Sequence, residues 1–213
     1  MREVLGPHLA RHGVFAAATI VGTPRRRGSR PLTKGGGAWP RWERDIRRIL
    51  AQQCQADVRV TTLFDLYGLP PGLPGLAEHG ADQDTVRRCE SLECALAEVI
   101  DDRRFIPYLQ RHEFEALVLA SLDSLRSLFD TPEDHSGMNA LSSELSGWDP
   151  EDVDDGRDTA PSKRLLGHVP GYAKTVHGPL AVADMGLPVL RLRCPRFGAW
   201  LAQLEAAAAA GNP

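Results

Sequence analysis

Short apolar runs that favour strands alternate with amphipathic helical segments over the first half of the chain, and this alternation restricts the fold more than any other feature. The runs that favour strands span residues 14–22 (VFAAATIVG), 57–65 (DVRVTTLFD) and 104–110 (RFIPYLQ). The segments with apolar residues at helical spacing span residues 2–12, 40–53 and 82–100. This order predicts an α/β fold in which helices flank a central, mostly parallel sheet.

The predicted elements differ in how clearly the sequence marks them. The alternation of apolar and polar residues in 57–65 is imperfect, which is typical of a strand covered on both faces. Pro107 lacks a backbone N–H and indicates an edge strand or a bulge at 104–110. The helix at 82–100 has a regular apolar stripe, formed by Val86, Cys89, Leu92, Leu96 and Val99.

The second half of the chain is expected to complete a single domain over residues 1–213. Residues 130–160 are polar and acidic and predict an inserted loop with short helices. From residue 161 onward the pattern is helical again, and the tail at 206–213 is expected to fray. The last helix is marked by Phe197, Trp200, Leu201 and Leu204.

Composition predicts a cytoplasmic globular protein. The 213 residues are 42% hydrophobic, and no apolar run is long enough to cross a bilayer. The first residues are charged and then broken by Gly6-Pro7, unlike a secretion signal. The cysteines show no CxxC pair and no regular disulfide framework. The spacing of Cys89 and Cys94 could fit a metal site, but Cys89 falls on an apolar helical stripe, so we expect buried, reduced thiols at Cys54, Cys89, Cys94 and Cys194.

The net charge of −3 is distributed unevenly. Residues 25–48 hold nine Lys and Arg against two acids, which makes this segment +7 and the remainder −10. The basic residues are Arg25, Arg26, Arg27, Arg30, Lys34, Arg41, Arg44, Arg47 and Arg48. Such a segment is either a contact surface for nucleic acid or another polyanion, or a solvated loop and helix face.

Asp65 stands at the end of the strand predicted at 57–65, just before the Pro/Gly-rich loop that contains GLPPGLPG. In open α/β sheets ligands bind beyond the carboxyl ends of the strands, where a carboxylate can hold Mg²⁺ together with other oxygens and water. Asp is also common in turns, where its side chain bonds to nearby backbone groups. Asp65 is therefore either a metal ligand or a turn-capping residue.

Glu113 and Glu115 follow the strand predicted at 104–110, in the motif HEFEA, and so also lie at the carboxyl end of a strand. The spacing is not HExxH, which excludes a zincin. At a strand-to-helix corner one glutamate can point into a site while the other caps the helix. The alternative is that both are first-turn acids favoured by the helix dipole.

Lys163 and Arg164 lie in the motif APSKR at the start of a predicted helix. Backbone N–H groups and adjacent cations suit a phosphate, although a proline in the first helical turn followed by surface charges produces the same pattern. Lys174 and His177, in GYAKTVHGP, add a cation and a titratable group. The histidines without a predicted role are His8, His12, His79, His135 and His168.

Several common sites are excluded. The chain has no GxSxG nucleophile elbow, no P-loop and no GxGxxG motif. The acidic run DPEDVDDG at 149–156 lacks the glutamate that ends an EF-hand loop, so a solvated acidic loop is expected there.

Five motifs stand in order along the chain: TTLFDLYGLP, FIPYLQRHEFEALV, APSKRL, YAKTVHG and LRCPRFGAWLAQLE. Together they resemble the bacterial domain-of-unknown-function family 4276, from about residue 2 to residue 205. The resemblance implies a Toprim-like Rossmannoid fold. That superfamily includes topoisomerase and primase domains and the nuclease halves of overcoming-lysogenisation-type defence systems.

The resemblance also implies a chemistry, in which acidic residues hold Mg²⁺ against a nucleic-acid phosphate. The residues expected to bind metal and act in catalysis are Asp65, Glu113 and Glu115. The residues expected to contact phosphate are Arg25, Arg26, Arg27, Lys163, Arg164 and Lys174. Genes of the family often resemble companions of an ATPase, which implies an AAA- or ABC-type ATPase partner and a role in phage defence.

The chain departs from the family pattern at its start. Members begin with a strand of the form hhVEGxTEExF, whose glutamate is the expected metal-binding acid. This sequence begins at Met1-Arg2-Glu3-Val4, just after that point, so a missing N-terminal strand is expected, from a start assigned too late or from an inactivating truncation. Glu3 lies in the helix predicted at 2–12 and does not replace that glutamate.

Two main functions are expected from these features. The first is a Mg²⁺-dependent nuclease that cleaves phosphodiester bonds of nucleic acid. The second is a catalytically inactive, nucleic-acid-binding or regulatory subunit of an ATPase complex, which the absent glutamate favours. A nucleotide-handling enzyme or phosphotransferase on the same fold is a third alternative.

Overall fold

The structure is a computed structural model that describes residues 2–21, 37–53, 58–153 and 159–209. The chain divides into two compact units. Unit 1 comprises Met1–Ala16 and Gln110–Ala206, and unit 2 comprises Ala17–Leu109 and Ala207–Pro213. None of the helices in the described ranges has the length and apolar character needed to cross a bilayer. The organisation as one domain over residues 1–213 stays a prediction.

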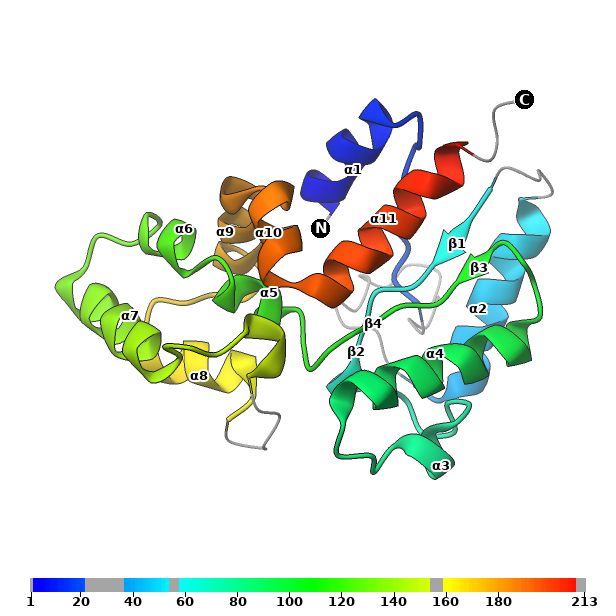
Figure 1. The fold of residues 1–213 in the computed structure, drawn as a ribbon, viewed down its shortest axis with the longest axis horizontal. Coiled ribbons are helices and arrows are strands. Elements are labelled where there is room, and N and C mark those ends of the chain that lie inside the picture. Colours follow the sequence, from blue (N-terminus) through cyan, green and yellow to red (C-terminus); the bar gives the residue numbers. More distant parts are fainter. Residues whose placement is uncertain (1, 22–36, 54–57, 154–158, 210–213) are drawn as a thin grey trace, which may run out of the picture. The chain divides into compact units, whose positions relative to one another are not determined.

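Unit 2 combines helices with very short strands (Figure 1). In chain order its elements are α2 (Trp39–Gln52), β1 (Val60–Thr61), β2 (Phe64–Asp65), the 3-10 helix η1 (Leu66–Gly68), α3 (Leu76–His79), α4 (Thr85–Ile100) and β3 (Phe105–Ile106), followed by β4 (Leu109–Gln110). β1 pairs in parallel with β3, with Val60 opposite Phe105 and Thr61 opposite Ile106. β2 and β4 form a second two-stranded sheet.

The α/β class is confirmed, but the single central sheet is wrong, because the described residues form two two-stranded sheets. Pro107 has no N–H to donate, so it interrupts the backbone ladder in the middle of 104–110. Opposite this point Thr62 uses its side chain, whose Oγ1 accepts from Tyr108 N at 2.7 Å and donates to the Tyr108 carbonyl at 2.9 Å. The predicted strands at 57–65 and 104–110 are therefore each divided into two.

The apolar faces of α2 and α4 form the core of unit 2 together with the strands. The buried side chains of these two helices include Trp42, Ile46, Leu50, Cys89, Leu92 and Leu96. Burying one large aliphatic side chain stabilises a fold by about 1.5–3 kcal/mol. α4 begins at Asp84, whose carboxylate accepts from the N–H groups of Val86 and Arg87 at 3.0 and 3.1 Å. The helices predicted at 40–53 and 82–100 are confirmed.

Arg104 joins the end of α2 to the turn before β3. Its guanidinium donates to both carboxylate oxygens of Asp102, from Nε at 3.0 Å and from Nη2 at 2.7 Å. It also donates to the carbonyls of Leu50, at 3.2 Å, and Gln53. Because the last carbonyls of a helix lack partners within it, Arg104 stabilises the end of α2. Its hydrogen bonds lower the pKa of Asp102 to about 2.

Replacing Arg104 by lysine is expected to lower the free energy of unfolding by about 1–2 kcal/mol, because an ammonium loses the bonds to the two α2 carbonyls. Since the pKa of Asp102 is lowered, its stabilising effect is present above 3.8 and is lost as the pH falls through about 2. Lysine also loses the two-point bonding of the guanidinium to Asp102, so the difference in unfolding free energy between wild type and variant should shrink in acid. Urea unfolding at neutral and acidic pH measures it, and Arg103→Lys, at the exposed neighbouring position, is the control. Identical midpoints for Arg104→Lys and wild type at neutral pH would contradict this role.

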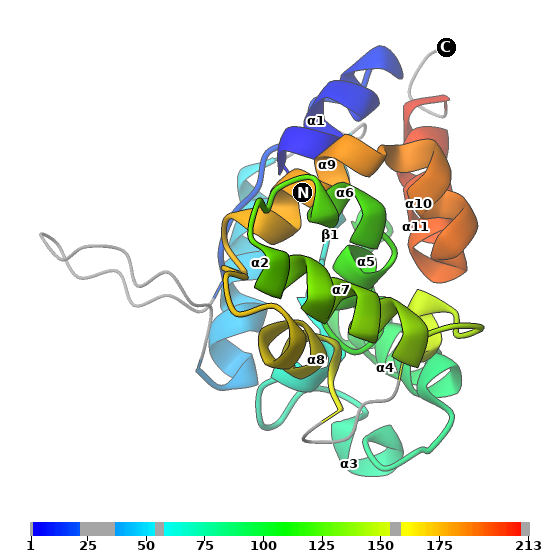
Figure 2. The same ribbon diagram turned by 90° about the vertical axis from the view of Figure 1, so that its left-hand side faces the viewer.

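Unit 1 is helical, and Figure 2 shows it from the side on which α6, α7 and α8 lie. Its elements are α1 (Arg2–Arg11), α5 (Glu115–Leu119), α6 (Leu122–Arg126), α7 (Pro132–Glu144), the 3-10 helix η2 (Pro150–Asp152), α8 (Pro161–His168), α9 (His177–Met185), α10 (Leu187–Arg193) and α11 (Pro195–Ala209). The helix predicted at 2–12 is confirmed by α1, and the last predicted helix by α11. The core side chains of unit 1 include Leu117, Leu125, Leu141, Leu165, Leu190, Phe197 and Leu201.

The buried strand predicted at 14–22 is wrong for its described residues, 14–21, which form no strand. Phe15 is 89% exposed and Ile20 is 60% exposed. The N–H of Val14 donates to the carbonyl of Leu9 at 2.9 Å, which closes the end of α1 instead of starting a sheet. A strand needs a neighbour along its backbone, and an apolar sequence alone does not supply one.

The polar segment 130–160 also differs from the prediction of an inserted loop. It contains α7, a helix of 13 residues that begins where Thr131 Oγ1 accepts from the N–H of Asp134 at 3.1 Å. The solvated loop predicted at 149–156 is wrong at Glu151, which is 3% exposed. Glu151 accepts from the N–H groups of Arg196 and Phe197, at 2.9 and 3.2 Å, and so caps α11. Residues 154–158 lie outside the described residues.

Two smaller predictions remain. α11 is described as far as Ala209, and the frayed tail expected at 206–213 stays a prediction, since residues 210–213 lie outside the described residues. Cys89 and Cys194 are buried thiols as expected, whereas Cys94 is exposed, and Cys54 lies outside the described residues.

Candidate functional site

A tight turn between β4 and α5 positions the two glutamates of HEFEA. His112 has a φ of +65°, a left-handed value that is uncommon for a residue with a Cβ. Its buried imidazole stabilises this conformation, because Nε2 lies 3.0 Å from the carbonyl oxygen of Glu151. Glu113 lies in the turn and Glu115 is the first residue of α5. The strand-to-helix corner predicted for these glutamates is confirmed.

Glu113 contacts the start of α8. Its Oε2 accepts a hydrogen bond at 3.0 Å from the backbone N–H of Ser162, the second residue of that helix. The first N–H groups of a helix have no partner within it and favour a negative charge, so the carboxylate stabilises this end. The motifs HEFEA and APSKR, which are 49 residues apart at this contact, therefore meet in unit 1.

Glu115 is buried beside a lysine of the third motif. Its side chain is 8% exposed, and Oε1 lies 3.4 Å from Nζ of Lys174, whose side chain is 41% exposed. Burial raises the pKa of Glu115, the charge of Lys174 opposes that shift, and the neighbouring carboxylate of Glu113 adds to it. The site thus contains two interacting carboxylates and one partly exposed cation.

The hydroxyl of Tyr172 is a buried polar group with no hydrogen-bond partner among the described residues. Burial and the charges of Glu115 and Glu113 raise the pKa of Tyr172. A Cβ at Gly178 would lie 2.9 Å from this hydroxyl, so the absence of a side chain at position 178 leaves room for the hydroxyl. Burying a hydroxyl without a partner costs free energy, and such a group beside two carboxylates favours a role in ligand binding.

Asp65 lies at the end of β2 in unit 2, directly before η1. Its side chain makes no capping hydrogen bond to η1, and the choice between a metal ligand and a residue that bonds to the turn stays open. Glu113 and Glu115 belong to unit 1. A metal site shared by all three acids therefore stays a prediction.

The basic residues predicted to contact phosphate fall into three groups. Lys163 is exposed on α8, and Lys174 lies beside Glu115 as described. Arg164 forms an ion pair with Glu144 and donates from Nε to the carbonyl of Thr159 at 2.7 Å, so it joins α8 to α7 and supports the fold. Arg25, Arg26 and Arg27 lie outside the described residues.

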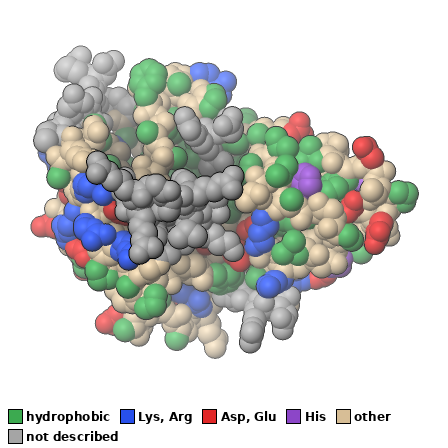
Figure 3. All heavy atoms as spheres, turned by 180° about the vertical axis from the view of Figure 1, so that it is seen from behind, with side chains coloured by type: hydrophobic (Ala, Val, Ile, Leu, Met, Phe, Trp, Pro, Cys, Tyr) green, Lys and Arg blue, Asp and Glu red, His purple; other side chains and the backbone are tan. Residues whose placement is uncertain are grey.

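The described part of the basic segment lies on α2 in unit 2. Figure 3 shows Lys and Arg side chains gathered on the side of the molecule that includes α2. Arg47 pairs with Glu43 at 2.8 Å, and Arg48 pairs with Asp45 at 2.9 Å. Arg41 and Arg44 are exposed. Part of the positive charge of α2 is thus neutralised within the helix.

The two glutamates of unit 1 are of the ligand type that Mg²⁺ takes, and magnesium binding stays a prediction. Mg²⁺ is usually held by one or two carboxylates, and its other positions are filled by waters and substrate phosphate oxygens. Glu113 and Glu115 provide two carboxylates, and each contacts a group that can donate to anionic oxygen: Ser162 N–H bonds to Glu113, and Lys174 pairs with Glu115. The contacts of Ser162 and Tyr172 were not predicted from the sequence, although both residues lie in the motifs APSKRL and YAKTVHG.

Comparison with models of known protein families gives a match to this chain. The model of the family described as Domain of unknown function (DUF4276) matches residues 1–205, which is nearly the whole chain. No curated protein and no solved structure matches the chain at a significant level.

Proposed function

We propose, from the premise that the chain belongs to the DUF4276 family, that it is a Mg²⁺-dependent phosphodiesterase acting on nucleic acid. One observation carries the proposal: Glu113 and Glu115 meet the start of α8 and Lys174 in unit 1. Two carboxylates beside donors for anionic oxygen are the groups that metal-dependent phosphodiester cleavage requires.

The side chains have separate roles in this proposal. Glu113 and Glu115 hold the ion. Lys174 pairs with Glu115 when no ion is bound, and it contacts a phosphate oxygen of the substrate when the ion is bound. The Tyr172 hydroxyl, which is buried beside them, donates to a bound oxygen. Bound Mg²⁺ polarises the phosphoryl group and lowers the pKa of its water.

The finer features of the proposal rest on the collinear motifs. We propose a Toprim-like fold, an ATPase partner and a role in phage defence, and we keep Asp65 as a candidate metal ligand of unit 2. Lys163 and the exposed Arg41 and Arg44 are proposed to contact the phosphate backbone, which would make binding depend on salt concentration.

The test is cleavage of supercoiled plasmid and of single-stranded RNA by the full chain, with Mg²⁺ and with a chelator. Wild type should cleave only with Mg²⁺, and Glu113→Gln should be at least about 100-fold slower because one ligand of the ion is lost. Glu98→Gln changes an exposed glutamate of α4 in the same way and should leave the rate unchanged.

Equal rates for wild type and Glu113→Gln would assign the cleavage to a contaminant and refute the proposal. Absence of cleavage, with or without an ATPase partner, but salt-dependent binding of the same nucleic acids would favour the alternative function. In that alternative the chain is a catalytically inactive, nucleic-acid-binding or regulatory subunit of an ATPase complex.

A further inference from the structure

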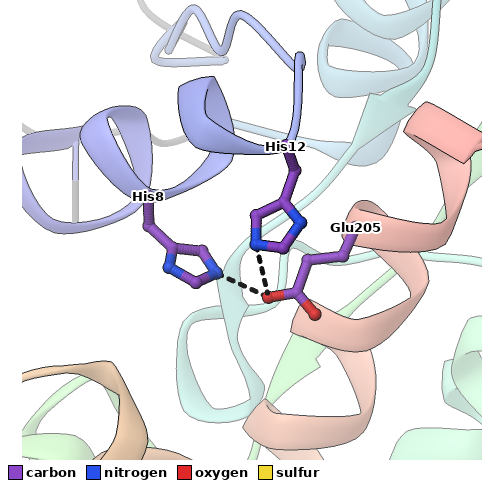
Figure 4. A group of neighbouring side chains, drawn as sticks. All are labelled: His8, His12 and Glu205. Atoms are coloured by element: carbon purple, nitrogen blue, oxygen red, sulfur yellow. Dashed lines mark hydrogen bonds and ion pairs between the residues drawn. The ribbon is translucent and has the colours of Figure 1, made fainter.

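Two histidines and one glutamate of unit 1 converge away from the paired glutamates (Figure 4). His8 and His12 project from the end of α1, and Glu205 projects from α11. His8 Nε2 lies 2.5 Å from Glu205 Oε1, and His12 Nε2 lies 3.9 Å from the same oxygen. The three ligand atoms all lie within 4.8 Å of one another.

We propose that His8, His12 and Glu205 form a binding site for Zn²⁺ that links α1 to α11. In a tetrahedral zinc site with bonds of about 2.0–2.2 Å, neighbouring ligand atoms are about 3.3–3.6 Å apart. The observed separations of 2.5 and 3.9 Å from Glu205 Oε1 lie on either side of this value, so small side-chain rotations suffice. Three protein ligands leave the fourth position for water.

The types of ligand atom in this group favour Zn²⁺ over Mg²⁺. Imidazole nitrogens suit Zn²⁺ and its first-row neighbours, whereas Mg²⁺ prefers oxygen ligands alone. His8 lies in the last turn of α1 and His12 in the turn that follows it, and their ring centroids are 4.9 Å apart. This site is therefore distinct in its residues and in its ion from the proposed magnesium site.

Glu205 is already held in position by a second contact. Arg191 donates to both of its carboxylate oxygens, from Nη1 to Oε1 at 2.9 Å and from Nη2 to Oε2 at 2.7 Å. This pairing, with the hydrogen bond from His8, lowers the pKa of Glu205 and keeps it ionised as a ligand must be. A carboxylate oxygen has two lone pairs, so Oε1 can accept from Arg191 and also bind a metal.

Arg11 opposes metal binding at His8. Its Nη2 lies 3.2 Å from His8 Nδ1 and donates to it, which places the ring proton on Nε2, facing Glu205. When Zn²⁺ binds Nε2, that proton leaves and Nδ1 takes one up, so Arg11 must turn away into solvent. Removing its charge and its hydrogen bond by Arg11→Gln is therefore expected to tighten Zn²⁺ binding several-fold.

The experiment uses the untagged full chain, freed of metal by chelation and titrated with Zn²⁺ in a calorimeter and with Co²⁺ by visible absorption. We expect one equivalent of either ion to bind and the melting temperature to rise with Zn²⁺. Removing a residue that only orients a metal ligand lowers metal affinity by about 10–100-fold. Since His12→Gln removes a ligand itself, we expect it to weaken Zn²⁺ binding by at least about tenfold. His12 is 44% exposed, so this variant should remain folded.

The matched control is His168→Gln. His168 also bonds to a glutamate, with Nε2 2.8 Å from Glu144 Oε2, but belongs to no group of three metal ligands among the described residues. It should bind Zn²⁺ as wild type does. Wild-type affinity in His12→Gln, loss of affinity in His168→Gln, or no binding of Zn²⁺ by the folded wild type would each overturn the proposal. Because the readout is metal binding, its failure leaves the proposed cleavage untouched.

Discussion

Glu115→Gln is expected to slow Mg²⁺-dependent cleavage by at least about 100-fold, equivalent to about 2.7 kcal/mol of transition-state stabilisation, without unfolding the chain. An amide is a weaker ligand for a hard cation than a carboxylate and carries no charge. The fold should tolerate the change because the carboxylate is buried and its pKa is raised by that burial. The charged group is therefore held in the site at a cost to stability.

The pH dependence of stability follows from the direction of that shift. Because the folded pKa of Glu115 lies above its ordinary value of 4.5, its contribution to stability is fully present below that value and is lost as the pH rises through the folded pKa. The glutamine variant does not titrate at this position. The stability of wild type relative to Glu115→Gln should therefore be greatest in mild acid and should decrease toward alkaline pH, as measured by urea unfolding.

Glu151→Gln is the matched control, since Glu151 is also a buried glutamate of unit 1 with a pKa raised by burial. Its carboxylate accepts two backbone N–H groups at the start of α11, and an amide offers only one oxygen to them. We expect it to lose about 1–2 kcal/mol of stability but to cleave at nearly the wild-type rate. If Glu115→Gln instead lost stability and kept its activity, Glu115 would be a structural residue.

Gly137→Ala is expected to lower the free energy of unfolding by about 3 kcal/mol, and the melting temperature by about 10 °C. A Cβ at this position in α7 would clash with the carbonyl oxygen of His168, at the end of α8. That atom belongs to the backbone and cannot rotate away, so the two helices would have to separate. Helix propensity alone would predict the opposite effect on stability, because alanine normally stabilises a helix relative to glycine.

Gly167→Ala separates the close contact from the effect of propensity. Gly167 lies in α8, and a Cβ there would meet no atom within 4 Å. We expect this variant to be as stable as wild type or more stable by about 0.5–1 kcal/mol. Thermal unfolding followed by circular dichroism compares both variants, and equal melting temperatures would show that α7 and α8 are not packed tightly at Gly137.

The helices of this protein were predictable because their evidence is local. The apolar stripes at 40–53 and 82–100 recur every three to four residues, and that period is specified by the backbone geometry of one helix alone. The position of Glu113 and Glu115 at a strand-to-helix corner was predictable because both residues directly follow the apolar run at 104–110. A strand has no such independence, since its hydrogen bonds belong to a neighbour.

The failed predictions involve partners distant in sequence. The run at 14–22 has the apolar composition of a strand, yet its described residues, 14–21, form no strand. Glu151 is acidic in an acidic segment, and its role as the cap of α11 depends on residues 45 positions further on. His8 and His12 are an unremarkable pair until Glu205, at the other end of the chain, lies beside them.

The amino-acid order by itself determined the α/β class, the main helices and the motifs that identify the family, because each depends on periodicity or on contiguous residues. Only the tertiary structure decided which of those motifs share a site, which arginine is used in packing and which histidines acquire an acidic neighbour. Such contacts depend on how helices pack against one another. Packing brings together side chains that are far apart in sequence, and no periodic pattern in the sequence indicates which ones will meet.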